Sequence, residues 1–411
     1  MSEATSTGTQ ARPLAGARPR FHLIFSPFLY APESVRTVFT VTFATCCLPL
    51  VAGLVLFGWR AAVVAAISIA SCVLTEKLFF KVVRAPALVG RSHAWLTGLL
   101  LGLTLPADVP WYVPLVAAAF ATTLGKAIFG GVGHFLWQPA LVGRLAVTVI
   151  FPALLTGADG PILARNQLVR GDIRQVQAVQ RLRDWPDQLP PAGYDGFVVE
   201  KPQQTLRLLY DSQRPRFSGI AYVGDGLERP EPPLLSRLPS VRRMMYGVRP
   251  GPMGGTCAVL ILVAGVYLMY RNYVKPHLPL SFLLAAAVVA AIAPIHLVGH
   301  DGATRTVWYP FLYEGLAEGC VFLIYHLTSG GMLLAAFLLA TEMTSRPVTR
   351  GGQVIFGLLG GALAMVLRIC TRVPVPVFMA VLAVNTLTPL IDALWRPRVM
   401  GQSWLARFRL G

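Results

Sequence analysis

Two polar clusters interrupt the apolar stretches of this chain, and both contain residue types that can hold a ligand. The first is a glycine-rich turn with Gly130, Gly131 and Gly133. Glycine lets the backbone turn sharply or approach another group closely, and a helix start beside such a turn can present amides to an anion or to the polar edge of a flavin. Close packing of helices through small residues is the alternative explanation.

Two basic residues flank this turn and could pair with a phosphate of a lipid or of a cofactor. Lys126 precedes the turn, and Arg144 lies one helical turn inside the next apolar segment. A lysine at the end of an apolar segment can also extend to the membrane interface, which gives Lys126 a second explanation. Arg144 lies deeper in its segment, where an arginine normally has a functional partner.

The second cluster follows a later apolar segment and is rich in oxygen atoms. Glu342 stands at the end of that segment with Thr341, Thr344, Ser345 and Thr349 close by. Carboxylate and hydroxyl oxygens suit a cation or the hydrogen-bonding edge of a flavin. An acid that caps a loop at the membrane interface is the alternative.

Further polar residues lie in apolar surroundings, where each could handle ions or protons or serve a structural role. They are Glu76, Lys77, Glu314, Glu318, His326, Asn385 and Asp392. The sequence has no Ser-His-Asp arrangement, zinc motif, phosphate-binding loop or dinucleotide fingerprint at usable spacing. The six cysteines lack the spacing of a metal site and are expected to be buried small residues. We therefore predict no catalytic side chain and no metal site.

Composition shows what kind of elements must position these clusters. Of the 411 residues, 55% are hydrophobic and only 13% are charged, and the apolar runs have about the 20-residue length of a spanning helix. The chain is therefore predicted to be a polytopic membrane protein in contact with the lipid bilayer. The formal charge of +17 comes almost wholly from arginine between the spans, so a nucleic-acid-binding face is not expected.

Hydropathy predicts an all-α polytopic fold of about ten transmembrane helices in two sets of five. The predicted spans are 36–58, 61–82, 94–105, 110–129, 137–156, 255–274, 279–299, 320–341, 353–370 and 374–395. The third is short and ends at Pro106, and the eighth is expected to break near Glu342. Such breaks survive at membrane depth only where protein, water or a ligand surrounds the freed backbone.

The domain boundaries follow from these spans. We expect an N-terminal tail at 1–35, a first five-helix repeat at 36–156, a polar extramembrane insert at 157–250, a second repeat at 251–396 and a C-terminal tail at 397–411. Basic residues in the short loops place both termini in the cytoplasm, and the insert then lies on the outer face. Five spans followed by five more give inverted repeats, an arrangement that brings broken helices face to face.

Several motifs in this order resemble one family of membrane proteins, formed by the RnfD component of the Rnf electron-transport complex and the NqrB component of the sodium-translocating NADH:quinone oxidoreductase. The matching segments of the first half are Ser26-Pro27, Val73 to Glu76, Thr97 to Pro106, Gly125-Lys126, Phe129 to Gly133 and Pro139 to Arg144. Those of the second half are Ala340-Thr341, Pro347 to Arg350, Gly352-Gln353, Ile355 to Gly357, Asn385 and Pro389 to Asp392.

The resemblance implies a complex in the bacterial inner membrane that couples electron flow through flavins to Na⁺ or H⁺ translocation. This chain would be a subunit of that redox-driven translocase and would act with the other subunits of an Rnf-like or Nqr-like complex, rather than as a stand-alone enzyme. The implied cofactor site comprises Gly130, Gly131, Gly133, Gln138, Arg144, Thr341 and Glu342.

The chain departs from the family where flavin chemistry is concerned. The family joins flavin mononucleotide (FMN) through its phosphate to a threonine in a Ser-Gly-Ala-Thr motif, and the counterpart here reads Ser218-Gly219-Ile220-Ala221. Alanine has no hydroxyl to form that bond. A partial look-alike ends at Thr304, but it lies in another loop. We therefore expect any FMN or riboflavin to be bound noncovalently.

Other departures touch the second flavin and the family's acidic positions. Asparagines that follow the glycine turn in the family are replaced by Phe135 and Gln138, and only Gln138 keeps an amide. An Asp-Pro pair becomes Glu342-Met343, and a Glu-Gly pair becomes Val375-Pro376. A flavin-free structural or channel-like paralogue of the same fold is the alternative function, and a solute transporter that acts alone is a third.

Overall fold

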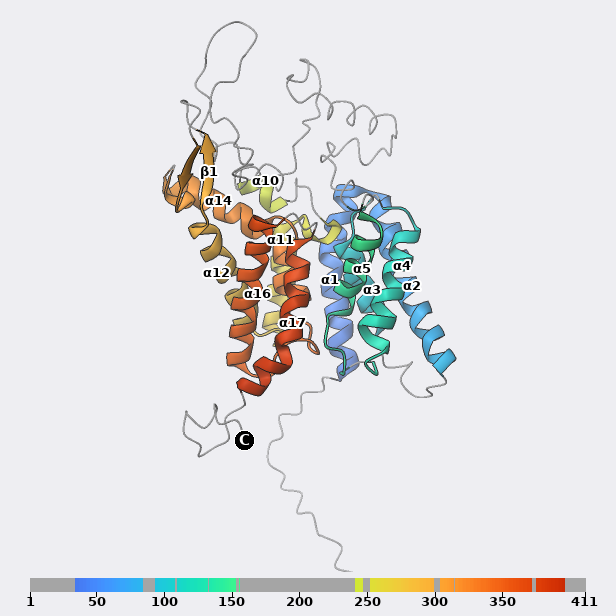
Figure 1. Ribbon diagram of the computed structural model, residues 1–411. Coiled ribbons are helices and arrows are strands. Elements are labelled where there is room, and N and C mark those ends of the chain that lie inside the picture. The colour runs from blue at the N-terminus through green and yellow to red at the C-terminus, as the bar shows by residue number, and fades with distance from the viewer. Residues whose placement is uncertain are drawn as a thin grey trace, which may run out of the picture.

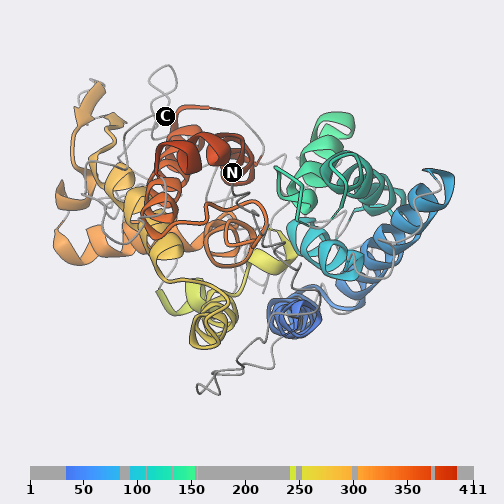
Figure 2. The same cartoon turned by 90° about the horizontal axis from the view of Figure 1, so that it is seen from below.

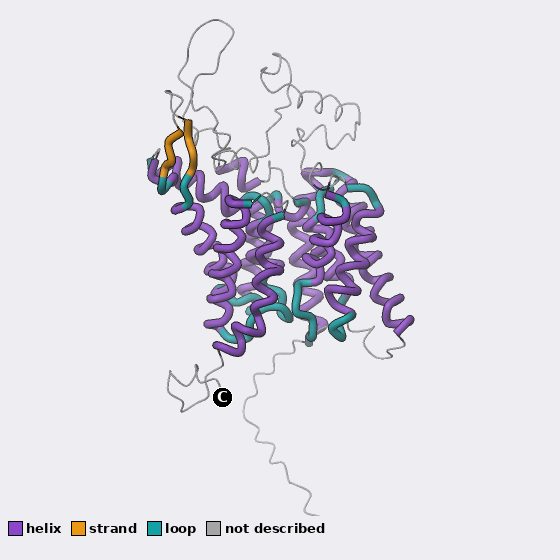
Figure 3. Tube along the Cα trace, in the orientation of Figure 1, coloured by secondary structure: helices purple, strands orange, loops and turns teal. Residues whose placement is uncertain are grey.

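The computed structural model describes residues 34–83, 93–107, 109–131, 133–152, 155, 241–246, 252–298, 304–313, 315–371 and 375–395. Within these ranges the helices form two groups that stand side by side (Figure 1), and the view along the helices separates the two groups clearly (Figure 2). We call them the N-terminal group, residues 34–155, and the C-terminal group, residues 241–395. Most of their helices run roughly parallel to a common axis (Figure 3).

The N-terminal group is built from apolar helices that follow the predicted spans, except that the fifth ends at Ile150 instead of residue 156. Its elements are α1 (Val35–Phe57), α2 (Trp59–Val83), α3 (Ala94–Thr104), α4 (Tyr112–Thr122), the π-helical turn η2 (Thr123–Ala127) and α5 (Pro139–Ile150). Gly58, with a φ of 72°, separates α1 from α2. Pro139 opens α5 at a position where the missing amide proton is not needed.

The C-terminal group repeats this helical character with more interruptions. Its helices are α10 (Val241–Tyr246), η4 (Met253–Gly255), α11 (Ala258–Tyr270), α12 (His277–Ile292), α13 (Pro310–Tyr313), α14 (Leu316–Thr328), α15 (Met332–Leu334), the π-helical turn η5 (Ala335–Leu339), α16 (Arg350–Cys370) and α17 (Pro376–Leu394). Of the predicted insert 157–250, the described part is α10 alone.

Length and apolar composition identify a polytopic helical membrane protein. Among the described residues, α1, α2, α16 and α17 are each long and apolar enough to cross a membrane, and a bent pair of helices makes a fifth candidate. The outer face of α2 exposes large apolar side chains such as Leu74 and Leu78, which suit contact with lipid chains. The remaining predicted positions carry shorter apolar helices.

The break in the eighth predicted span lies earlier than expected. The segments Gly319–Thr328 and Met332–Leu339 meet at an angle of 59°. Between them, Gly330 and Gly331 have φ values of 65° and 78°, a conformation that residues with a Cβ rarely adopt. The prediction of a break near Glu342 was therefore wrong in position, because the paired glycines interrupt the helix about ten residues before the end of the span.

The seventh predicted span, 279–299, also ends early. Helix α12 stops at Ile292 because Pro294 disfavours the helical conformation of Ala293, whose ψ is 128°. The chain continues as strand β1 (Ile295–Val298), which pairs antiparallel with β2 (Thr304–Val307), so that Ile295 lies opposite Val307. This hairpin is an addition that hydropathy did not predict.

Several pairs of elements bring the two groups into contact. Helix α1 packs against α11, α5 contacts α17, and the short helix η4 lies against α3. At the end of α3, the Met253 amide donates a hydrogen bond to the Leu105 carbonyl over 2.9 Å. Because Leu105 is just past the last helical residue of α3, this bond satisfies a carbonyl that the interrupted helix leaves free.

Glycine brings neighbouring helices unusually close within each group. A Cβ on Gly98 of α3 would come within 2.5 Å of the Ile69 Cα in α2. A Cβ on Gly361 of α16 would overlap the Phe282 carbonyl of α12. Small residues at such crossings are how membrane helices gain close van der Waals packing, and they hold the interrupted elements in a rigid frame.

Candidate functional site

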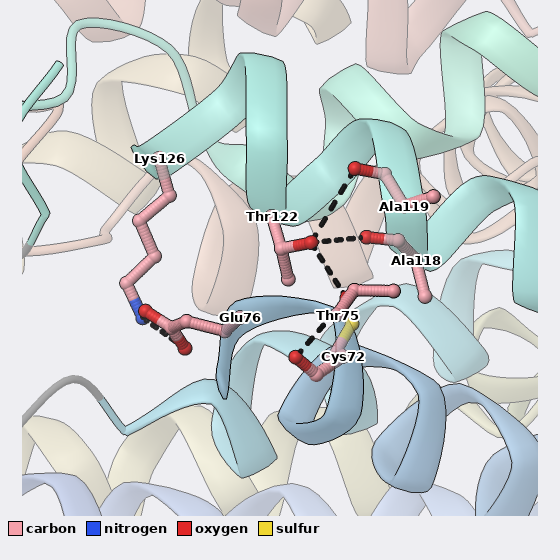
Figure 4. A network of polar contacts seen from close by, with 7 residues as sticks. All are labelled: Cys72, Thr75, Glu76, Ala118, Ala119, Thr122 and Lys126. Atoms are coloured by element: carbon pink, nitrogen blue, oxygen red, sulfur yellow. Dashed lines mark hydrogen bonds and ion pairs between the residues drawn. The ribbon is translucent and has the colours of Figure 1, made fainter. Parts of the chain in front are cut away.

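A buried ion pair lies beside the π-helical turn η2. Lys126 Nζ is 3.2 Å from Glu76 Oε1 and 3.4 Å from Glu76 Oε2, and both side chains are almost fully buried. Figure 4 shows the two side chains extending toward each other from different helices. A π-turn adds a residue to the helix and is frequent at functional sites, and here it directs Lys126 inward to the carboxylate of α2. The Lys126 side chain therefore does not extend to the membrane interface, which was the second explanation for this residue.

Two threonine hydroxyls extend the same polar contact between α2 and α4. Thr75 Oγ1 and Thr122 Oγ1 lie 2.8 Å apart, and Thr122 also donates to the Ala118 carbonyl at 2.8 Å. Buried Cys72 lies next to this network (Figure 4). The two hydroxyls therefore satisfy each other's hydrogen-bonding capacity inside the protein. This contact links α2 to the end of α4.

The glycine turn has a conformation that only glycine adopts readily. Gly130, Gly131 and Gly133 each have a φ of 97°. The Gly130 amide donates to the Ala127 carbonyl and the Gly131 amide to the Lys126 carbonyl, each over 3.1 Å. A Cβ atom added to any of these glycines would meet nothing closer than 3.9 Å. The three residues therefore serve the sharp turn rather than close helix packing.

Gln138 joins this turn to α5. Its side-chain Oε1 accepts a hydrogen bond from the Leu141 amide over 3.2 Å, so Gln138 caps the start of the helix. Its Nε2 donates to Glu342 Oε2 over 3.3 Å. Gln138 is nearly fully buried, and so is Arg144, six residues further along in α5.

The second predicted cluster lies where η5 ends. The Thr341 hydroxyl donates to the Phe337 carbonyl over 2.6 Å, which occupies a carbonyl that the end of the π-turn leaves open. Glu342 then turns toward Gln138. The structure thus brings the two clusters together across the boundary between the groups, and Trp137 Nε1 adds a second link by donating to Thr386 Oγ1 over 2.9 Å.

A cleft opens beside Thr341 and Glu342. Its volume is about 30 Å³, and it is bounded by α1, α3, α11 and η5. Apolar side chains such as Phe39, Leu100 and Leu338 form its walls, and Thr341 and Glu342 form its polar end. An apolar slot with a few convergent polar groups is the usual form of a ligand site.

Arg368 stabilises the break between α14 and α15, which the sequence analysis did not predict. Its Nη1 donates to the His326 carbonyl over 2.8 Å and to the Ser329 carbonyl over 3.3 Å, and its Nη2 donates to Ser329 Oγ. These carbonyls lose their helical partners at the bend. An arginine inside an otherwise apolar, glycine-rich span is the sequence signal for this role.

The remaining predicted residues lie apart from this centre or outside the described structure. Thr304 is in β2, and its side chain is outside the described residues, as are Asp301 to Ala303. The segment Ser218 to Ala221 also lies outside the described ranges. Among the residues that the structure describes, no group of three or more His, Cys, Asp or Glu side chains could hold a metal ion.

These features define a class of protein: a polytopic helical membrane protein in which two helical groups meet at interrupted helices lined by polar side chains. The model of the NQR2, RnfD, RnfE family matches residues 23–401, and the chain belongs to this family.

Named relatives agree with that assignment over nearly their whole length. The chain is 31% identical to the D subunit of the ion-translocating oxidoreductase complex of Stutzerimonas stutzeri over 357 residues, covering 85% of this chain and 88% of the relative. It is 27% identical over 382 residues to the D subunit of the proton-translocating ferredoxin:NAD(+) oxidoreductase complex of Clostridium ljungdahlii, with coverage of 93% and 96%. The D subunit of the ion-translocating oxidoreductase complex of Halorhodospira halophila is 28% identical over 386 residues, with the same coverage.

Proposed function

We propose that this chain is the membrane subunit of an oxidoreductase complex in which electron flow drives Na⁺ or H⁺ across the bacterial inner membrane. The relatives carry names of such subunits. The observation that carries the proposal is the hydrogen bond between Gln138 and Glu342, because it couples the turn before α5 to the turn after η5. In this proposal the contact transmits a change at one turn to the other.

The arrangement of contacts supports an inverted repeat of five plus five spans. In the N-terminal group α2 packs on α4 and α4 on α5, and in the C-terminal group α12 packs on α16 and α16 on α17. The helices that would be equivalent under a twofold axis, α1 with α11 and α5 with α17, meet at the boundary. A twofold axis in the membrane plane produces this pairing.

A noncovalent flavin, FMN or riboflavin, is the cofactor that the donor set fits. Its ring system needs an apolar slot with donors and acceptors at one edge. The cleft beside Thr341 and Glu342 has apolar walls and polar groups, but at about 30 Å³ it would have to widen to admit the ring. Gln138 and Glu342 would supply an amide and a carboxylate, and Arg144 would supply a cation for a phosphate. The turn at Gly130, Gly131 and Gly133 would let the ligand approach the backbone closely, because the Gly130 and Gly131 amides already donate within the turn. A bound flavin would supply one- and two-electron transfer, and these residues would orient it and exclude water.

Covalent attachment at the family position is not proposed, because Ala221 has no hydroxyl. Thr304 is the only threonine of the look-alike loop and could carry the phosphoester in its place. The same Ala221 favours the alternative function, a flavin-free structural or channel-like member of the family.

The chain would work with partner subunits and with both termini in the cytoplasm. The relatives are named as subunits of oxidoreductase complexes, and in this proposal the partner subunits deliver and remove electrons. Under this orientation the Gln138–Glu342 contact faces the cytoplasmic side, and the hairpin β1–β2 lies at the outer end of the C-terminal group (Figure 1).

The test uses the complex purified with all its subunits. Flavins are extracted and identified by chromatography, and the denatured gel band is inspected for covalent fluorescence. The complex is then placed in liposomes, and ion movement is recorded on addition of an electron donor. We expect extractable flavin, no fluorescent band and donor-dependent ion movement. A complex without flavin and without donor-dependent ion movement would overturn the proposal in favour of the flavin-free scaffold, and uptake of a solute without any donor would indicate the lone transporter.

A further inference from the structure

The turn between α11 and α12, residues 271–276, gathers basic side chains at one end of the C-terminal group. Arg271 Nη2 donates to Tyr273 Oη over 3.1 Å, and the central guanidinium carbon of Arg271 lies 5.5 Å from the centre of the Tyr273 ring. Lys275 Nζ donates to the neutral Asn272 Oδ1 over 2.9 Å. Because no Asp or Glu occurs between positions 251 and 300, this part of the chain does not neutralise its own cations.

The backbone of this turn has a fixed path. The Tyr273 and Val274 amides both donate to the Leu268 carbonyl, over 3.0 and 3.3 Å. Asn272 has a φ of 62°, a left-handed conformation that asparagine adopts more readily than most residues with a Cβ. Tyr273 is only 5% exposed. The turn therefore holds its basic side chains at defined positions.

Arg346 brings a third cation to the turn from a distant part of the chain. Its Nη2 donates to the Tyr273 carbonyl over 3.2 Å, and its Nη1 is buried without a hydrogen-bond partner among the described residues. A guanidinium carries five donors in a planar fork that matches the oxygen atoms of a phosphate. The acid that follows η5, Glu342, accepts a hydrogen bond from Gln138. Two arginines thus meet at Tyr273, one at its hydroxyl and one at its carbonyl.

Exposed side chains of α11 indicate that this cluster lies at a membrane–water interface. Tyr267 and Tyr270 are 45% and 82% exposed in the last turn of α11, and tyrosine concentrates at the level of lipid headgroups. Val263 and Val266 are exposed further along the helix and suit contact with lipid chains. Helix α12 begins at His277, and the start of a helix adds partial positive charge. The basic side chains thus stand where lipid phosphates lie.

We propose that the turn 271–276 and Arg346 form a headgroup site for one anionic phospholipid. Arg346 and Lys275 bind the phosphate oxygens, while Arg271 holds Tyr273 in place and adds positive charge. The acyl chains run along the exposed side of α11. In the predicted orientation this lipid belongs to the inner leaflet, where basic pockets between membrane helices bind anionic headgroups.

The arrangement differs from a general excess of positive charge on one side of the membrane. Lys81, in the last turn of α2, is an exposed cation on the same predicted side. Such a lysine attracts any anionic surface through its charge alone. At the turn 271–276, by contrast, hydrogen bonds to one buried tyrosine fix two guanidinium groups. A fixed cluster predicts saturable binding of a single lipid.

The test uses the purified complex after lipid has been removed in a neutral detergent, and it depends neither on flavin nor on ion movement. Phosphatidylglycerol, phosphatidylcholine and inorganic phosphate are each titrated at constant ionic strength, and the thermal unfolding midpoint of this subunit is recorded. We expect a saturable rise with phosphatidylglycerol alone, because a ligand that binds the folded state stabilises it.

Substitutions that remove the charges locate the response. Arg346→Gln combined with Lys275→Gln should raise the half-saturating concentration of phosphatidylglycerol about tenfold or more. Arg346→Lys keeps a cation but loses the fork, so it should retain part of the response. Lys81→Gln is the matched control and should leave the response unchanged. Each response is measured against the same variant without lipid, so a lower starting midpoint does not obscure it.

A photoactivatable phosphatidylglycerol tests the unaltered protein directly. We expect peptide mapping to find its adducts on the turn 271–276 or beside Arg346, and adducts confined to other segments would overturn the site. Equal stabilisation by phosphatidylglycerol and phosphatidylcholine would overturn it too, as would an unchanged response in the double variant. An equal rise with inorganic phosphate would overturn the lipid as the occupant and assign the cluster to a free anion.

Discussion

The side-chain amide of Gln138 donates a hydrogen bond to the carboxylate of Glu342, although the two residues are 204 positions apart in the chain. The contact ties the capped start of α5 to the turn that follows η5. Both residues lie at the end of a helical element, since Gln138 is the cap of α5 and Glu342 follows η5. The bond is therefore placed where it can couple the two groups.

Exchanging the two partners tests this contact. Gln138→Glu alone places two carboxylates within contact distance and should lower the free energy of unfolding by about 1–3 kcal/mol. Combining Gln138→Glu with Glu342→Gln restores one donor and one acceptor and should recover most of that loss. Thr386→Val is the control, because it removes an exposed link between the same groups and should have an effect below about 1 kcal/mol. Thermal unfolding of the four proteins measures these differences, and failure of the exchange to rescue would contradict the coupling.

The buried ion pair should respond very differently to single and double substitution. Lys126→Met leaves the Glu76 carboxylate buried without its cation, which destabilises by about 3–5 kcal/mol. Replacing both residues, with Glu76→Leu added, removes the uncompensated charge and should restore much of the stability. Lys77→Met, at an exposed neighbouring position, serves as control. Chemical unfolding in detergent compares the variants, and equal losses for the single and double variants would argue against the pair.

Gly133 isolates the requirement for backbone conformation in the glycine turn. A Cβ at this position meets nothing within 4 Å, so Gly133→Ala introduces no clash with other residues. The φ of 97° should nevertheless make the substitution unfavourable by about 1–2 kcal/mol. His134→Ala changes the exposed neighbouring residue and should be close to neutral. The thermal unfolding midpoints of the two variants measure this difference. An unchanged midpoint for Gly133→Ala would contradict the requirement for a positive φ at this position.

Arg368 should be needed for the bend between α14 and α15. Arg368→Met removes the donors that satisfy the His326 and Ser329 carbonyls and should destabilise by about 3 kcal/mol or more. Arg368→Lys keeps a cation with three donors but loses the planar fork, so an intermediate loss is expected. Ser329→Ala removes only the hydroxyl acceptor and should have the smallest effect. A different order of the three thermal midpoints would contradict the role assigned to this arginine.

Membrane orientation can be tested with single reactive cysteines. Trp111→Cys lies in the turn before α4 on the predicted outer side, and His277→Cys lies at the start of α12 on the predicted inner side; both positions are exposed. In a background without Cys320 and Cys370, an impermeant maleimide should label Trp111→Cys in intact spheroplasts and His277→Cys only after permeabilisation. The reverse pattern would invert the predicted topology.

Hydropathy located the helices well because each helix must bury its own backbone in lipid. It misplaced the break of the eighth span, since Gly330 and Gly331 interrupt a run that remains apolar on both sides and therefore leaves no trace in hydropathy. The end of α12 was missed for a related reason, as β1 continues the apolar composition beyond Pro294. Both errors concern backbone conformation, which a local average of polarity does not report.

The candidate site was predicted in part. The glycine turn and the Thr341–Glu342 cluster were each identified from residue type, and the turn's conformation explains its glycines. The ion pair between Lys126 and Glu76 and the cap supplied by Arg368 were not predicted. Each depends on which residues of distant helices face each other. Residue types and spacing in a single sequence do not reveal these contacts. The π-turn that directs Lys126 inward is also invisible to a regular 3.6-residue pattern.

The bond from the Met253 amide to the Leu105 carbonyl has a consequence for how the protein is made. A ribosome that adds about 5–20 residues per second needs on the order of 7–30 s to translate from one residue to the other. During that interval the carbonyl at the tip of α3 has no partner, so the early helices must be sheltered by the insertion machinery, by lipid headgroup water or by one another. The N-terminal group therefore gains this hydrogen bond only after η4, which belongs to the C-terminal group, has been synthesised.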